Sequence, residues 1–127
     1  MDKAYHILVV DDDFCISDII KNMLEDEGFQ VTVAPDGRSA LDVYKVIGAD
    51  LILLDIKMPG MNGYKVLEQL RRESQVPVIV LTGLYDTEAV TRMIELGAND
   101  YVIKPFQDRE LMTRIKAKIG QPHISIN

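Results

Sequence analysis

Five polar residues of this chain, each within two positions of the end of a short apolar run, have the side-chain types that phosphoryl transfer requires. They are Asp11, Asp12, Asp55, Thr82 and Lys104. Carboxylates held close together repel one another, so either their pKa values rise or a cation compensates their charge. Oxygen ligands without His or Cys suit a hard cation, and an open site that keeps waters suits Mg²⁺ better than Ca²⁺. Asp55 would then act as a nucleophile that forms an aspartyl phosphate, while the lysine ammonium and the threonine hydroxyl stabilise the phosphoryl oxygens.

Each of these residues also has a plainer interpretation when it is taken alone. The acidic run 11–13 can simply favour the start of a helix through the helix dipole, and Asp13 keeps that interpretation. Asp55 can be a turn residue, Thr82 an ordinary strand residue and Lys104 a solvated charge. The functional interpretation therefore depends on a fold that brings the five side chains together.

Hydrophobic periodicity predicts five strands, each followed by an amphipathic helix. The strands are expected at residues 5–10, 30–33, 51–54, 77–81 and 101–103, and the helices at 15–28, 40–47, 62–70, 86–96 and 111–119. Asn62 and Asp86 are expected to cap the third and fourth helices. Short right-handed connections imply an α/β fold, a doubly wound five-stranded parallel sheet with helices on both faces. The carboxyl ends of the strands, and with them the five polar residues, then meet at one edge, where such proteins bind ligands.

Composition is that of one ordinary globular domain, with 127 residues of which 47% are hydrophobic and 27% charged. The net charge of −6 argues against a nucleic-acid binder, because attraction to phosphates requires a basic surface. The single Cys15 cannot form an internal disulfide, and we find neither a signal-peptide pattern nor an apolar run that could span a bilayer, so a cytoplasmic protein is expected. The sequence also lacks a Gly-rich phosphate loop, so a nucleotide is not the expected phosphoryl donor.

Several short motifs resemble the receiver domain of two-component response regulators. They are Asp11-Asp12, Asp-Ile-Lys-Met-Pro-Gly-Met-Asn-Gly from Asp55 to Gly63, Thr82-Gly83, the run from Gly97 to Tyr101, and Lys104-Pro105-Phe106, in the right order over residues 5–119. The resemblance implies a flavodoxin-like strand order 2-1-3-4-5. It also implies a signalling switch and no metabolic enzyme, with a receiver domain at residues 1–120 and a tail or the start of a linker at 121–127.

The same resemblance implies the chemistry of individual positions. Asp55 would accept a phosphoryl group from the phosphohistidine of a histidine kinase or from a phosphotransfer protein. Asp12 and Asp55 would ligate Mg²⁺ together with the backbone carbonyl of Lys57, and Asp11 would assist, mainly through water. Lys104 would pair with the phosphoryl group.

The resemblance further implies how phosphorylation reaches an output. Thr82 and Tyr101 would be a coupled switch pair, and the Lys104–Pro105 bond would be cis. The last helix resembles that of regulators with winged-helix DNA-binding outputs, which form dimers through their fourth helix, fifth strand and fifth helix. Asp100 of one chain would then pair with Arg114 of a second copy, and DNA would be contacted only through an output domain outside this chain.

Two positions depart from that dimerising pattern. Asn99 stands where those regulators usually carry Asp, and Ala89-Val90 supplies no basic partner on the fourth helix.

Two other functions fit parts of the pattern. The strand and acidic run at residues 7–13 also resemble the nucleophile motif of haloacid-dehalogenase-type phosphatases, which use Mg²⁺ and an aspartyl phosphate. In that family, however, an acidic motif follows the lysine, whereas here Asp55 comes before Thr82 and Lys104. A flavin-binding module of the same topology is the other alternative, and the three carboxylates would repel its phosphate.

Overall fold

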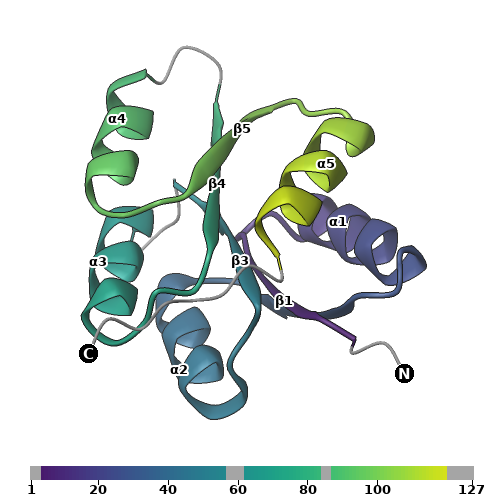
Figure 1. Cartoon of the computed structure of the whole chain (residues 1–127), viewed down its shortest axis with the longest axis horizontal. Helices are drawn as coiled ribbons and strands as arrows, with labels where there is room; N and C mark the ends of the chain where they lie inside the picture. The colour runs from purple at the N-terminus through teal and green to yellow at the C-terminus, as the bar shows by residue number, and fades with distance from the viewer. Residues whose placement is uncertain (1–3, 57–61, 84–86, 120–127) are drawn as a thin grey trace.

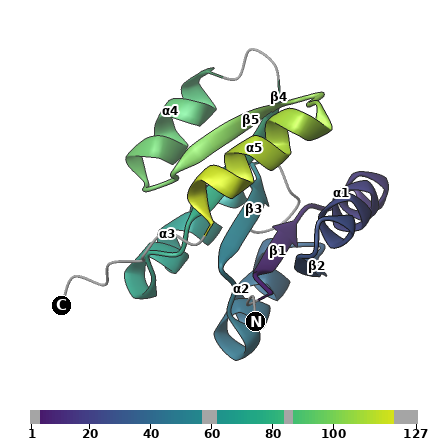
Figure 2. The same cartoon turned by 45° about the vertical axis from the view of Figure 1, so that its right-hand side comes forward.

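The chain forms a five-stranded parallel sheet between two layers of helices (Figures 1 and 2). The structure is a computed structural model that describes residues 4–56, 62–83 and 87–119. The strands are β1 (His6–Val10), β2 (Gln30–Ala34), β3 (Leu51–Asp55), β4 (Val78–Gly83) and β5 (Asp100–Lys104), and the helices are α1 (Phe14–Asp26), α2 (Gly37–Ile47), α3 (Gly63–Glu73), α4 (Thr87–Glu95) and α5 (Asp108–Lys118). The strand order is 2-1-3-4-5, so the predicted fold class is confirmed. Within the described ranges, every helix is too short or too polar to serve as a membrane span.

The sheet buries both of its faces, which explains the nearly continuous apolar runs of its central strands. Helices α2, α3 and α4 cover one face, and α1 and α5 cover the other (Figure 1). Along β3, Ile52 and Leu54 pack on the face covered by α2, α3 and α4, while Leu51 and Leu53 pack on the face covered by α1 and α5. All five residues of this strand are buried, so Asp55 at its end has a rigid base.

Side-chain caps start helices directly after the loops that follow the strands. Asp13 accepts hydrogen bonds from the backbone N–H groups of Cys15 (3.0 Å) and Ile16 (3.2 Å), so its interpretation as a helix-start residue is confirmed. Asn62 accepts from the N–H of Lys65 at 3.1 Å and caps α3, as predicted. The predicted cap Asp86 and the predicted tail at residues 121–127 lie outside the described residues.

The last helix begins at Asp108 and not at residue 111, where its apolar stripe begins. Its first turn holds exposed residues that carry no periodic signal, and acidic side chains there favour a helix start through the dipole. Hydrophobic periodicity therefore locates the buried part of this helix and misses its exposed beginning.

Candidate functional site

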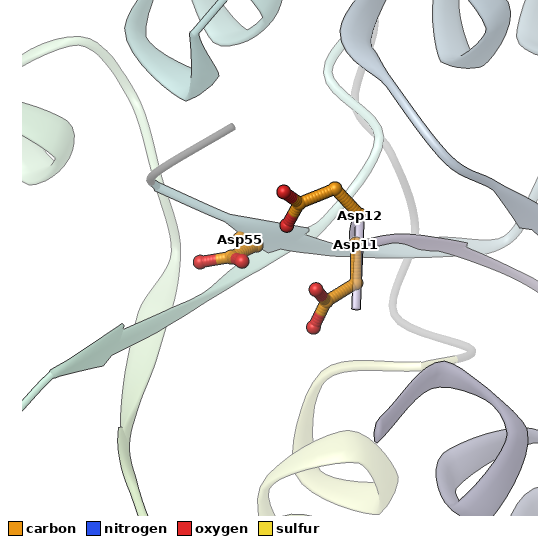
Figure 3. A group of neighbouring side chains, drawn as sticks. All are labelled: Asp11, Asp12 and Asp55. Atoms are coloured by element: carbon orange, nitrogen blue, oxygen red, sulfur yellow. The ribbon is translucent and has the colours of Figure 1, made fainter. Parts of the chain in front are cut away.

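The three predicted carboxylates lie together at the carboxyl edge of the sheet (Figure 3). Ligand oxygens of Asp11, Asp12 and Asp55 all lie within 4.8 Å of one another. Strands β1 and β3 are neighbours, with Val10 paired to Leu54, so the residue after β1 and the last residue of β3 end at the same level. Asp11 and Asp55 are buried, with 1% and 7% of their surface exposed, whereas Asp12 is exposed.

Lys104 reaches this cluster from the end of β5. Its Nζ lies 3.3 Å from Oδ2 of Asp55 and 3.6 Å from Oδ2 of Asp11. The lysine side chain is 24% exposed, so its charge stands at the mouth of the site. One ammonium facing three carboxylates leaves an excess of negative charge at this edge, and this charge attracts a cation. The same charge repels a dianionic phosphoryl group until a bound cation compensates it.

The donor atoms fit a hard divalent cation. Oδ1 of Asp11 accepts a hydrogen bond from the N–H of Asp13 at 2.9 Å, but Oδ2 is buried and accepts none from the part of the chain that the structure describes. A buried anionic oxygen without a hydrogen bond costs free energy, and a bound cation removes that cost. Three carboxylates without His or Cys form the oxygen set that Mg²⁺ prefers. The predicted carbonyl ligand, Lys57, lies outside the described residues.

Thr82 and Tyr101 occupy neighbouring strands. Val80 pairs with Tyr101 across β4 and β5, and Thr82 lies two residues after Val80, so Thr82 and Tyr101 face the same side of the sheet. The Thr82 side chain is buried, and its hydroxyl donates to the carbonyl of Gly83 at 3.5 Å, the long limit of a hydrogen bond. Tyr101 is 37% exposed. The Lys104–Pro105 peptide bond is cis, as the resemblance implied.

Gly63 belongs to this site, although the sequence analysis named it only as the last residue of the Asp55–Gly63 motif. A Cβ atom at position 63 would lie 2.8 Å from the carbonyl oxygen of Asp55 and 3.0 Å from Cα of Ile56, closer than backbone atoms allow. The Gly63 N–H also donates to the carbonyl of Ile56 at 3.1 Å. The first residue of α3 thus packs directly on the end of β3. The first position after a helix cap tolerates almost any residue, so a glycine there needs another reason. This glycine was the available sequence signal for the close approach.

The residues predicted at a dimer face have partners inside the chain. Nη1 of Arg114 lies 2.7 Å from Oδ1 of Asp100, and this hydrogen bond raises the pKa of the Arg114 guanidinium. Asn99, the departure from the dimerising pattern, accepts hydrogen bonds through Oδ1 from the N–H of Val78 (2.9 Å) and from Arg71 (3.0 Å). The Asn99 side chain therefore joins α3 to the starts of β4 and β5.

A doubly wound parallel sheet with an acidic cluster and a lysine at its carboxyl edge is typical of α/β domains that accept a phosphoryl group. The chain matches the response regulator receiver domain over residues 7–116 and belongs to that family. It is therefore a phosphoacceptor domain of the two-component type, and its relatives are response regulators, which are signalling switches and not metabolic enzymes. Receiver domains in general bind Mg²⁺. The family match gives no support to the phosphatase alternative.

Similar proteins include regulators of transcription and a chemotaxis protein. The DNA-binding response regulator MtrA of Mycobacterium tuberculosis is 43% identical over 113 residues, which are 89% of this chain and 50% of that protein. The probable transcriptional regulator ycf27 of Cyanidium caldarium is 43% identical over 115 residues, 91% of this chain and 46% of that protein. The chemotaxis protein CheY4 of Vibrio cholerae superposes with a TM-score of 0.87 at 29% identity, covering 92% of this chain and 100% of that one. The chain spans about half the length of the curated relatives it matches.

Proposed function

We propose that Asp55 is the phosphorylation site of this receiver and takes its phosphoryl group from a histidine kinase or a phosphotransfer protein. The observation that carries the proposal is the position of Asp55, buried at the end of β3, beside Asp11 and Asp12 and 3.3 Å from the ammonium of Lys104. The relatives named as response regulators support a phosphohistidine donor.

The transfer needs only the phosphohistidine donor and a proton from solvent water. A carboxylate oxygen of Asp55 attacks the phosphorus atom, and the new P–O bond forms as the P–N bond to the donor imidazole breaks. The imidazole keeps the electron pair of that bond and leaves as the neutral ring once water has supplied the proton. Lys104 pairs with a phosphoryl oxygen, and the Thr82 hydroxyl, weakly held in this structure, donates to another. Asp11, Asp12 and Asp55 would hold a Mg²⁺ ion, which when bound supplies positive charge to the phosphoryl oxygens.

The proposal extends to an output surface made by α4, β5 and α5. When the Thr82 hydroxyl turns towards the phosphoryl group, the space it leaves allows Tyr101 to move from its half-exposed position to a buried one. A ligand that binds one arrangement more tightly shifts the population of the two. We assign residues 1–120 to this receiver and residues 121–127 to a tail or linker. A second copy is the partner proposed for the surface, and contact with DNA would need an output domain outside this chain.

Phosphorylation with a small-molecule phosphodonor tests the acceptor. Intact mass of the wild type should increase by one phosphoryl group in the presence of Mg²⁺, and chelation should prevent the increase. Asp55→Asn should not acquire the mass, whereas Asp42→Asn, an exposed change on α2, should behave as the wild type. Equal labelling of Asp55→Asn, or labelling that does not depend on Mg²⁺, would overturn the proposal.

A further inference from the structure

Two arginine contacts join α3 and α4, the neighbouring helices on one face of the sheet (Figure 1). In one, the guanidinium of Arg92 on α4 lies over the ring of Tyr64 on α3, with Cζ 4.3 Å from the ring centroid. In the other, Arg71 near the end of α3 donates to the carbonyl of Gly97, directly after α4, at 3.1 and 2.9 Å. The two contacts lie at opposite ends of α3.

The Arg71 contact is built as a fixed anchor. Besides Gly97, the guanidinium donates to the carbonyl of Ser74 at 3.2 Å and to Oδ1 of Asn99 at 3.0 Å, and its burial lowers the pKa of Arg71. Gly97 has a φ of +109°, and a Cβ there would lie 3.0 Å from Nε of Arg71. Hydrogen bonds from a charged group to backbone carbonyls are stronger than neutral ones, so this end of α4 is held firmly.

The Arg92 contact is weaker and lies nearer the phosphoacceptor. Arg92 is exposed, and a cation–π contact at an exposed site contributes little and falls off when the cation moves away from the ring. Tyr64 directly follows Gly63, which lies so close to the end of β3 that an added Cβ would meet the backbone carbonyl oxygen of Asp55. A displacement at the end of β3 is therefore passed through the first turn of α3 to the ring that Arg92 covers.

We propose that the Tyr64–Arg92 contact is a latch that holds α4 in its unphosphorylated position. The proposal rests on the function proposed above and names a second connection from Asp55 to the output surface, besides Thr82 and Tyr101. At 4.3 Å the contact is well within the range of a cation–π interaction, so it stabilises this arrangement more than one in which α4 has moved away from the ring. The anchor at Gly97 confines that movement to the rest of α4. Loss of the latch therefore favours the phosphorylated arrangement.

The test compares Tyr64→Leu and Arg92→Gln, each of which removes the contact, with Tyr64→Phe, which keeps the ring. Beryllofluoride with Mg²⁺ is the phosphoryl mimic, and its apparent dissociation constant is measured by NMR titration. Tyr64→Leu and Arg92→Gln should each bind the mimic about two- to fivefold more tightly, the equilibrium equivalent of a surface cation–π contact. The double variant should show no further gain, and Tyr64→Phe should bind as the wild type.

Amide hydrogen exchange without the mimic gives an independent readout. Exchange in α4 should be faster in Tyr64→Leu and Arg92→Gln and unchanged in Tyr64→Phe, while exchange in α1 stays constant in all variants. Unchanged or weaker mimic binding in both variants, or unchanged exchange in α4, overturns the latch. If the wild type itself does not bind beryllofluoride, the proposed function is overturned, so the two failures are distinguishable.

Discussion

Arg114 of α5 and Asp100 of β5 form an ion pair within one chain, with Nη1 and Oδ1 2.7 Å apart. A dimer that joined Asp100 of one copy to Arg114 of another would break this pair in each chain. The exchange replaces one ion pair with another of the same kind, so these two residues contribute little net free energy to association. Glu110, 3.6 Å from Nε of Arg114, offers the guanidinium a second partner.

Replacement of Arg114 by alanine should lower the free energy of unfolding by about 0.2–1 kcal/mol, because the arginine side chain is 39% exposed and the pair is screened by solvent. The pKa of Arg114 is raised by Asp100, so the stabilisation is present below the unfolded pKa of arginine and is lost only as the pH rises through the still higher folded value. The loss measured by urea unfolding should therefore stay constant from about pH 6 to 9. The loss of unfolding free energy should be smaller in 1 M NaCl. As a control, Arg109→Ala on the same helix should leave the free energy of unfolding unchanged. A loss that is insensitive to salt would contradict the ion pair.

The sequence predicts the sheet, its order and the acidic cluster because each depends on strong local signals. Leu51 to Leu54 form an uninterrupted apolar run, and a parallel sheet brings its strand ends to one edge without further information. The role of Gly63 is not predictable in this way, since it depends on a distance between the backbones of α3 and β3. The partners of Asn99 and Arg114 within the chain were not predicted, for a related reason. Exposed polar residues have no periodicity that shows whether a partner lies within the chain or outside it.

Self-association should depend on the phosphoryl mimic. We expect wild-type protein to be mainly monomeric in sedimentation and to shift towards dimer with beryllofluoride, with Thr82→Ala responding less, because the hydroxyl links Asp55 to Tyr101. The environment of Tyr101, followed by NMR, should change when the mimic binds. If Tyr101 moves while the protein stays monomeric, the proposed dimer is wrong and the proposed switch is retained. An unchanged Tyr101 in the wild type would contradict the switch itself.

Substitution of Asn99 should separate its structural role from a role in dimers. Asn99→Leu leaves the N–H of Val78 without its acceptor and should cost about 1–3 kcal/mol of unfolding free energy. Asn99→Asp keeps an acceptor oxygen for Val78 and adds a charge that faces Arg71, so it should be at least as stable as the wild type. Thermal unfolding of the two variants and the wild type measures both changes in stability. A destabilised Asn99→Asp would show that an amide donor is needed there.

Gly63→Ala should impair both stability and phosphorylation. The added methyl group meets the backbone of Asp55, and such overpacking typically costs about 1–3 kcal/mol. Because α3 must then move away from the end of β3, the phosphorylation rate should fall about tenfold or more at saturating donor. Gly83→Ala, where a Cβ meets nothing within 4 Å, is the control for stability and should change it by less than about 0.5 kcal/mol. A folded Gly63→Ala that is phosphorylated at the wild-type rate would contradict the positioning role.

Mg²⁺ should stabilise the wild-type protein through the acidic cluster even without phosphorylation. An ion that binds only the folded state adds about 2.7 kcal/mol of unfolding free energy at a hundredfold excess over its dissociation constant, which thermal unfolding with and without MgCl₂ will detect. Asp12→Asn removes one of three mutually repelling carboxylates, so the metal-free variant should be as stable as the wild type or slightly more stable. The same variant should lose most of the response to Mg²⁺, while Asp42→Asn should retain it. NaCl at matched ionic strength controls for screening. If Asp12→Asn responds to Mg²⁺ as strongly as the wild type does, the ion binds elsewhere, and the buried Oδ2 of Asp11 must be compensated by Lys104 alone.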